Sequence, residues 1–214
     1  MNSNPSLDLA SLLCSRLCHD LLSPVGALSN GLELLSAEQD PEMRDRCFEL
    51  LEQSARISAD KLKFYRLAFG AAGGFSDVVS VSEAQAVVDA LAGNNSRVEV
   101  SWRLASESLP KAAIKTLLNF ALMGLDALVR GGKLELAAEL RDGVSEIVVR
   151  ATGTKVAFDP AIGRALEGDL PNRELSGRTA PAAMLYLMAE GTGGRLQHAV
   201  SDDALILGAE LPVT

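Results

Sequence analysis

The first seventy residues show a hydrophobic pattern with the period of an α-helix. Between residues 5 and 36, apolar side chains recur at spacings of three and four, as in a long amphipathic helix; they are Ala10, Leu13, Leu17, Leu21, Pro24 or Val25, Leu28, Leu32 and Leu35. Asp40 followed by Pro41 is typical of a helix N-cap and first helical residue, so a second helix is expected to begin there. Its apolar face contains Met43, Cys47, Leu50, Ile57, Phe64 and Leu67 or Ala68, with Ser54 and Lys61 as polar interruptions.

Two such helices, joined by a loop of about five residues, form an antiparallel hairpin. A lone hairpin would leave much of both apolar faces in water, so it must pack on the rest of the chain or on a second copy of itself. We favour the second copy, because the hairpin is long and the glycine-rich segment 70–74 suggests a hinge rather than a tight connection. Two chains would then form a dimeric four-helix bundle with twofold symmetry.

The remainder of the chain alternates between strand and helix patterns. Strands are expected at 78–81, 98–104, 134–140, 145–151, 194–200 and 204–211, and helices at 82–92, 111–129, 177–191 and, in a short form, 159–167. Gly131-Gly132 and Asp142-Gly143 supply turns between strands. The chain is therefore predicted to be an α+β protein with a helical hairpin (1–70), a linker (71–77) and an α/β sandwich with a mixed or antiparallel sheet (78–214).

The charge and the hydropathy of the chain limit its partners. The formal net charge is −8, from 20 Lys and Arg against 28 Asp and Glu, and no basic run interrupts it, which argues against nucleic acid and anionic membrane as main partners. No apolar run approaches the roughly 18–20 residues that span a bilayer. The first ten residues lack the features of a signal peptide, so a cytoplasmic protein is expected.

The cysteines do not predict a disulfide framework, because there are only three of them. Cys14 and His19, five residues apart, would point about 140° apart on a helix, and with Cys18 they would still be too few for a four-coordinate zinc site. We therefore expect no metal site, and we expect the cysteines to be ordinary apolar residues of a helical core.

The segment 16–28 of the first helix carries the candidate chemistry. His19 lies about 160° around the helix from Leu17 and from Leu21, so its ring is expected to face solvent. A neutral imidazole offers an unprotonated nitrogen that can attack phosphorus, and the adjacent Asp20 can orient the ring and take its proton. Pro24 removes the helical hydrogen bond to the carbonyl of Asp20 and favours a kink within one turn of the histidine.

The run His19-Asp20-Leu21-Leu22-Ser23-Pro24 resembles the H-box of sensor histidine kinases, which lies on the first helix of a dimeric bundle and carries the phosphorylated histidine. The second part of the chain is similar to the ATP-binding domain of these kinases, a Bergerat-type α/β sandwich. This resemblance implies a nucleotide site in the second part, and the motifs of that site can be compared with the kinase pattern.

Two segments of this site lack groups that kinases use. In the segment that resembles the N-box, Asn119 is kept, but Met123 stands where the resemblance requires a second asparagine for the Mg²⁺ of ATP, and a thioether is a poor ligand for this ion. In the strand that normally carries D-x-G-x-G, Ala151 replaces the adenine-binding aspartate. Gly153 is kept there, and Lys155 replaces the second glycine.

The third segment corresponds to the glycine-rich lid, whose three glycines match Gly177, Thr179 and Pro181. Lid glycines let backbone N–H groups approach phosphate closely, and proline has no N–H to offer. All three parts of the site have thus lost working groups, so the chain is expected to bind no ATP.

An intact H-box joined to a degenerate ATP-binding domain is similar to the histidine phosphotransferases of bacterial cell-cycle phosphorelays. The resemblance implies that His19 accepts phosphate from the receiver aspartate of a CckA-type hybrid histidine kinase. It also implies that His19 passes the phosphate to CtrA-type and CpdR-type response regulators, and that the receiver supplies Mg²⁺. The residues expected to support catalysis or to dock the receiver are Ser15, Arg16, Leu22, Ser23, Pro24 and Gly26, and further candidates are Arg164, Arg173 and Arg178.

The roles of three residues stay open at this point. Arg16 either offsets charge on the phosphate or pairs with the acidic receiver pocket, or it is simply a solvated surface arginine. Ser23 lies four residues after the histidine, where phosphatase activity is tuned in kinases. A phosphatase activity would therefore be a sub-case of the phosphotransferase interpretation. His198, on a predicted strand, is expected to be structural or on the surface and to have no partner.

Two other functions remain as alternatives. One is an active ATP-dependent sensor histidine kinase with an unusual nucleotide site, and the other is a scaffold that binds receivers without carrying phosphate. Nucleotide binding would favour the kinase, and activity that survives substitution of His19 would favour the scaffold.

Overall fold

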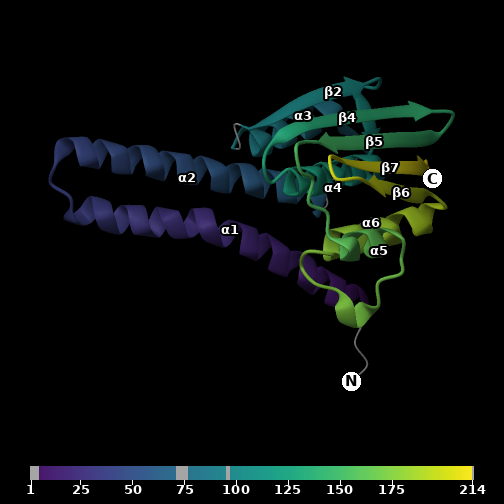
Figure 1. Ribbon diagram of the computed structural model, residues 1–214, viewed down its shortest axis with the longest axis horizontal. Coiled ribbons are helices and arrows are strands. Elements are labelled where there is room, and N and C mark those ends of the chain that lie inside the picture. Colours follow the sequence, from purple (N-terminus) through teal and green to yellow (C-terminus); the bar gives the residue numbers. More distant parts are fainter. Residues whose placement is uncertain (1–4, 71–76, 95–96, 214) are drawn as a thin grey trace.

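Helix α1 (Pro5–Ala37) and helix α2 (Pro41–Ala68) form the predicted antiparallel hairpin (Figure 1), in a computed structural model that describes residues 5–70, 77–94 and 97–213. The connecting loop spans only residues 38–40, so it is shorter than expected. The predicted N-cap of α2 is confirmed, because Asp40 Oδ1 accepts a hydrogen bond of 2.9 Å from the backbone N–H of Glu42. Arg44 Nη1 donates to the carbonyls of Leu35 and Glu38, which satisfies the end of α1.

The second part of the chain is built on a five-stranded sheet with the order β2-β4-β5-β7-β6. The sheet is mixed, because β2 and β4 are parallel and all other neighbouring strands are antiparallel. Asp142 and Gly143 join β4 to β5 with φ angles of 50° and 77°, as a tight hairpin turn requires. The strands are β2 (Val98–Leu104), β4 (Gly132–Arg141), β5 (Val144–Thr152), β6 (Arg195–Val200) and β7 (Ala204–Pro212).

The helices of this part cover one face of the sheet, and the other face is open (Figure 1). Alternate residues of the central strands β4, β5 and β7 are buried against the helices, which gives the strands their strict period of two. The helices are α3 (Val81–Gly93), α4 (Lys111–Ala127), α5 (Pro160–Leu166) and α6 (Ala180–Thr192). The predicted order of a helical hairpin followed by an α/β sandwich is therefore confirmed.

Three short elements differ from the expectation. The strand expected at 78–81 is β1 (Val78–Ser80); it ends at Ser80 because the hydroxyl of this residue accepts from the N–H of Ser82 and begins α3. Strand β1 pairs with β3 (Ser108–Pro110), and a short 3₁₀ helix, η1, spans Asn172–Glu174. The sequence pattern predicted neither β3 nor η1, because three residues are too few to show a period.

The end of α2 packs into the core of the α/β part. Phe64, Leu67 and Ala68 are buried in the same hydrophobic cluster as residues of α3 and α4. Tyr65 joins them, with its ring stacked on Phe69 at 5.3 Å between centroids. The expectation of a hinged rather than a tightly docked hairpin is therefore wrong at this end. The linker predicted at 71–77 lies, except for Asp77, outside the described residues.

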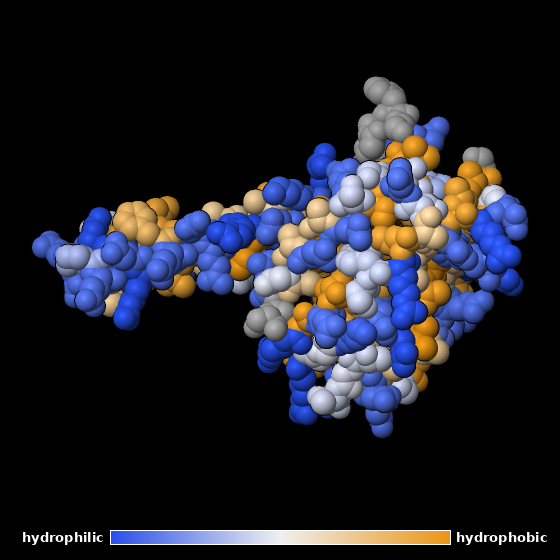
Figure 2. Space-filling view, turned by 90° about the horizontal axis from the view of Figure 1, so that it is seen from above, coloured by the Kyte–Doolittle hydropathy of each residue, from blue (hydrophilic) through white to orange (hydrophobic). Residues whose placement is uncertain are grey.

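The far end of the hairpin protrudes from the α/β part and keeps its apolar side chains in solvent. Leu32, Leu34, Phe48 and Leu50 are 53–61% exposed, and Figure 2 shows apolar side chains on the protruding end. The predicted apolar stripe is thus only partly covered within one chain. None of the described helices is long and apolar enough to cross a membrane.

The prediction for the cysteines is correct only in part. Cys47 is buried between the helices of the hairpin, whereas Cys14 and Cys18 are exposed on α1. The core assignment failed for these two because α1 presents only one narrow face to α2, and both cysteines lie away from it.

Candidate functional site

His19 lies on the solvent side of α1, as predicted from its angle to the apolar stripe. Its side chain is 83% exposed, and its Nδ1 atom lies 3.1 Å from Asp20 Oδ1. Leu22 beside it is 69% exposed, and a Cβ atom added to Gly26 would meet nothing within 4 Å. Ser15 and Ser23 are exposed on the same helix. A bulky partner can therefore reach the imidazole along this surface.

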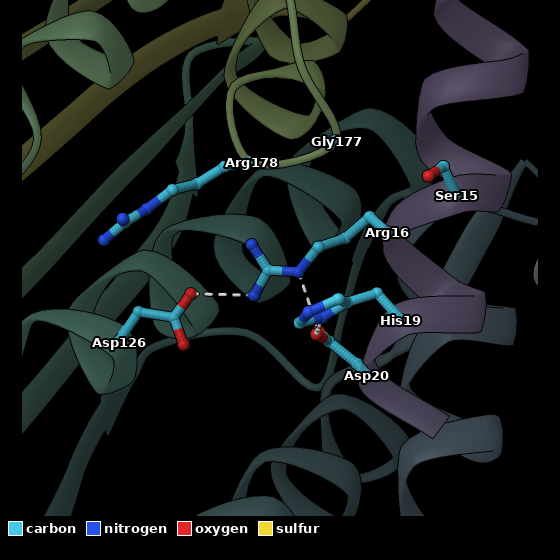
Figure 3. A pocket seen from close by; sticks show the side chains of 7 residues that line it. All are labelled: Ser15, Arg16, His19, Asp20, Asp126, Gly177 and Arg178. Atoms are coloured by element: carbon cyan, nitrogen blue, oxygen red, sulfur yellow. Dashed lines mark hydrogen bonds and ion pairs between the residues drawn. The ribbon is translucent and has the colours of Figure 1, made fainter. Parts of the chain in front are cut away.

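A pocket of about 520 Å³ opens beside His19, between α1 and the α/β part (Figure 3). Helix α4 contributes Asp126 to its wall, and the loop before α6 contributes Gly177 and Arg178. A Cβ atom at Gly177 would lie 3.4 Å from the backbone nitrogen of Arg16, so this loop rests directly on α1. The sequence pattern placed Gly177 in a nucleotide lid, whereas the structure places it against the helix that carries the histidine.

Both carboxylate oxygens of Asp20 have partners. Oδ1 faces His19, and Oδ2 accepts from Arg16 Nε at 2.7 Å and from the hydroxyl of Tyr65. Burial alone would raise the pKa of Asp20, but the hydrogen bonds from Tyr65, Arg16 and His19 outweigh it and hold this pKa below its usual value. An ionised carboxylate can only accept hydrogen bonds, so the geometry requires Nδ1 of His19 to carry the proton.

This assignment leaves Nε2 of His19 with the free electron pair. The contact of 3.1 Å places the neighbouring acid where it can orient the ring, which is the role predicted for Asp20. The second predicted role of Asp20, taking the proton of His19, is disfavoured, because a carboxylate with a lowered pKa is a weak base.

Arg16 is not a surface arginine, because its side chain is only 13% exposed. Its Nη2 donates to Asp126 Oδ2 at 2.8 Å, and its Nε donates to Asp20. Burial opposes the charge of Arg16, but Asp126 and Asp20 outweigh this effect and raise its pKa above the usual value. The prediction that Arg16 is a solvated surface arginine is therefore wrong, because Arg16 links α1 to α4. Its contact with the phosphate or with the acidic pocket of a receiver stays a prediction.

Pro24 is buried inside α1 and leaves the carbonyl of Asp20 without its helical donor. Lys61 of α2 replaces that donor, because its Nζ lies 2.7 Å from the oxygen of Asp20. The helix continues to Ala37 on the other side of the proline. Lys61, the polar residue in the apolar face of α2, thus replaces the hydrogen bond that Pro24 removes.

We expect the Lys61→Met variant to lose about 1 kcal/mol of stability, because the half-buried carbonyl of Asp20 would lose its donor. Chemical denaturation monitored by circular dichroism measures this loss. Adding Pro24→Ala should reduce the loss, since alanine returns a backbone N–H to the same carbonyl. Lys63→Met is the control, because Lys63 is 65% exposed and pairs only with Asp60 among the described residues. Equal stability losses in the Lys61 and Lys63 variants would contradict this account.

The residues of the degenerate nucleotide site fill the protein interior. Asn119 is fully buried, and its amide donates to the carbonyls of Lys115 and Ala68. Met123 and Ala151 belong to the hydrophobic core. The other lid positions follow the same trend, since Thr179 and Pro181 are buried at the start of α6. These side chains therefore contribute to the packing of the protein interior.

The two remaining positions, Gly153 and Lys155, lie in the segment that follows the central strand β5. A Cβ atom on Gly153 would lie 2.7 Å from the carbonyl oxygen of Gly131, so this glycine is required for close backbone packing. Lys155 is exposed. Neither position by itself indicates a ligand.

Of the three arginines predicted as receiver contacts, two lie beside Glu174 and one lines the pocket. Arg164 pairs with Glu174 at 3.1 Å, and Arg173 lies 3.9 Å from the same carboxylate. Arg178 alone lines the pocket beside His19.

The sequence analysis expected His198 to have no partner, and this expectation is wrong. Its Nδ1 lies 3.6 Å from Glu167 Oε1, and its ring packs near Phe158 at 5.7 Å between centroids. Within the described residues, no group of three His, Cys, Asp or Glu side chains could hold a metal ion. His198 thus has a local structural setting away from the pocket.

Sequence reasoning missed Tyr65 and Asp126, and it noticed Lys61 only as an interruption. These residues lie 45, 110 and 41 positions along the chain from the site residues that they contact. The one usable signal was the spacing on α2, since Tyr65 follows Lys61 by one helical turn and both can therefore reach the same part of α1.

Comparisons with known proteins indicate the family of this chain. A family model described as the histidine phosphotransferase C-terminal domain matches residues 81–204. Protein phosphotransferase ChpT of Brucella abortus (strain 2308) is 35% identical over 209 residues, which are 96% of this chain and 96% of that protein. A solved structure described as a bacterial phosphotransferase is 32% identical, with a TM-score of 0.84 over 97% of this chain and 98% of the other.

Proposed function

Because this chain belongs to the histidine phosphotransferase family and is therefore a protein phosphotransferase, we propose that His19 is the residue that carries the phosphoryl group between two receiver domains. The observation that carries this proposal is the geometry of the ring. The side chain is 83% exposed, and Nδ1 is occupied by the ionised carboxylate of Asp20. Nε2 is thus a free nucleophile that faces the side from which a partner can approach.

The transfer step requires little from this chain besides positioning. Nε2 of His19 attacks the phosphorus of a receiver phospho-aspartate in line, so the N–P bond forms while the P–O bond to the aspartate breaks and the receiver recovers its carboxylate. The proton on Nδ1 stays in place, and the ring becomes a cation that Asp20 stabilises. The reverse step then delivers the phosphoryl group to a second receiver.

The proposed partners are those that the family resemblance names. The donor is the receiver domain of a CckA-type hybrid histidine kinase, and the acceptors are CtrA-type and CpdR-type response regulators of the cell cycle. The receiver brings the Mg²⁺, and this chain binds no ATP, a view supported by the buried side chains of Met123, Ala151 and Pro181. The exposed surface around His19, formed by Ser15, Leu22 and Ser23, would dock the receiver.

We further propose that the chain works as a homodimer through the protruding end of its hairpin. Large apolar side chains of both helices remain exposed to solvent there, which is typical of a surface that a partner buries. A second hairpin would bury them in a four-helix bundle. The pocket beside His19 lies at the other end of the hairpin, so it stays accessible in such an assembly.

We expect phosphate label to reach this protein from a receiver and not from ATP. The protein is mixed either with radiolabelled ATP and Mg²⁺ or with the receiver domain of a CckA-type kinase that carries radiolabelled phospho-aspartate. Acid-labile, base-stable label from the receiver alone would support the proposal, since phosphohistidine has this stability. Label from ATP would identify an active kinase. If no label came from either source, the receiver-binding scaffold would be the remaining alternative.

A further inference from the structure

The carboxylate that orients His19 is itself held by side chains from outside α1. Tyr65 of α2 donates its hydroxyl hydrogen to Oδ2 of Asp20. Arg16 donates to the same oxygen at 2.7 Å and is tied by its other end to Asp126 of α4 at 2.8 Å. The acid beside the nucleophile is thus connected to the second helix of the hairpin by Tyr65. Figure 3 shows its connection to the α/β part through Arg16 and Asp126.

We propose that Tyr65 and Asp126 are positioning residues that keep His19 in the Nδ1–H tautomer. The two donors, Tyr65 and Arg16, both occupy Oδ2 of Asp20, so Oδ1 is the oxygen left for the imidazole. The hydrogen bond at one ring nitrogen decides which nitrogen carries the proton. This inference rests on the proposed function, because it concerns the nitrogen that would accept the phosphate.

The geometry of Arg16 makes Asp126 necessary. A guanidinium is planar and donates in a fixed fork, so fastening one end fixes the direction of the other. Asp126 Oδ2 fastens Nη2, and the Nε–H then points at Asp20. Without the charge on Asp126, Arg16 would turn toward the remaining anion and pull Asp20 away from the ring.

The charges of the cluster favour the phosphorylated state. With a neutral imidazole, Asp20 and Asp126 exceed Arg16 by one negative charge. When Nε2 forms its bond to phosphorus, the ring of His19 becomes a cation. The two positive charges of His19 and Arg16 then equal the two negative charges of Asp20 and Asp126. The cluster thus stabilises a charge that exists only after the attack begins, which is the condition for lowering the barrier rather than only holding the ground state.

The inference also gives the degenerate domain a role that needs no nucleotide. Asp126 lies on α4, seven residues after Asn119, in the last turn of the helix that resembles the N-box. The earlier turns of this helix are buried in the core, and the last turn presents Asp126 to α1. The α/β part thus helps to orient the ring of His19 through Asp126, Arg16 and Asp20.

Nitrogen NMR of the two histidines tests this directly. The full-length protein is labelled with ¹⁵N-histidine, and long-range ¹H–¹⁵N correlations are recorded at about pH 8.5, where histidine side chains in general are neutral. In the wild type, His19 should show a protonated Nδ1 and an unprotonated Nε2. Asp126→Asn and Tyr65→Phe should each shift His19 toward the Nε2–H tautomer and slow receiver-dependent labelling by roughly 10–100-fold.

The controls change similar groups away from the site. Tyr186→Phe removes the second tyrosine hydroxyl of the chain, and Glu210→Gln removes an exposed ion pair with Arg195. Both should keep the wild-type tautomer and rate, and His198 should be unchanged in every variant. A wild-type tautomer in both Asp126→Asn and Tyr65→Phe would overturn the inference. Failure of the wild type to accept phosphate would instead overturn the proposed function, and the tautomer measurement would still stand.

Discussion

Replacing His19 by glutamine is expected to abolish phosphoryl labelling of this protein, with a loss of at least about 10³-fold in transfer rate. Glutamine is similar in length and can still hydrogen-bond, but its amide nitrogen has no free electron pair for attack on phosphorus. The side chain is 83% exposed, so its loss should leave folding and the bonds of Asp20 to Arg16 and Tyr65 unchanged. The measurement is the initial rate of label transfer from a phosphorylated receiver domain, with equal thermal stability of both proteins as a check.

His198→Gln is the matched control, since it changes the other histidine of the chain. This residue lies on β6 beside Glu167 and not at the pocket, so the variant should label like the wild type. Label that persists in His19→Gln would place the acceptor elsewhere and return the chain to the scaffold alternative. Loss of label in both variants would show that the assay reports folding rather than chemistry.

The periodicity of the sequence was sufficient to predict most of the fold. The helical hairpin depends on a period of 3.6 residues that runs over many turns, and its N-cap at Asp40 depends only on local chemistry. The strands β4, β5 and β7 alternate strictly because one face of the sheet is buried. Such local patterns can be recognised without knowing which elements pack together, so the second part could be predicted as an α/β sandwich.

The candidate site was predicted only as far as its local part. His19 and Asp20 are adjacent, and the angle of His19 to the apolar stripe gave its exposure. Arg16 was misjudged because its burial depends on α4 and on the loop at Gly177, which come together only in the folded chain. The docked end of α2 was missed for the same reason, since a buried Phe64 has the same sequence pattern whether it packs on a second chain or on α4.

The double variant Phe48→Glu, Leu50→Glu is expected to dissociate the proposed dimer into monomers. These side chains are 53% and 59% exposed in a single chain, and burying each one against a partner stabilises the dimer by about 1.5–3 kcal/mol. The proposed twofold interface would contain each of them twice, and the new carboxylates would be buried there without partners. The dissociation constant should therefore rise by at least about 10⁴-fold. Sedimentation equilibrium over a range of concentrations measures this change.

A second double variant, Arg46→Gln with Arg56→Gln, changes the net charge by the same amount on exposed positions of α2 and should remain dimeric. If the Glu variant also stays dimeric, the exposed apolar end of the hairpin is not the interface. Because Asp20, Tyr65, Arg16 and Asp126 all belong to one chain, the monomeric variant should keep the Nδ1–H tautomer of His19. Loss of this tautomer on dissociation would mean that the partner chain helps to position the ring, and the site would then be a property of the dimer rather than of the single chain.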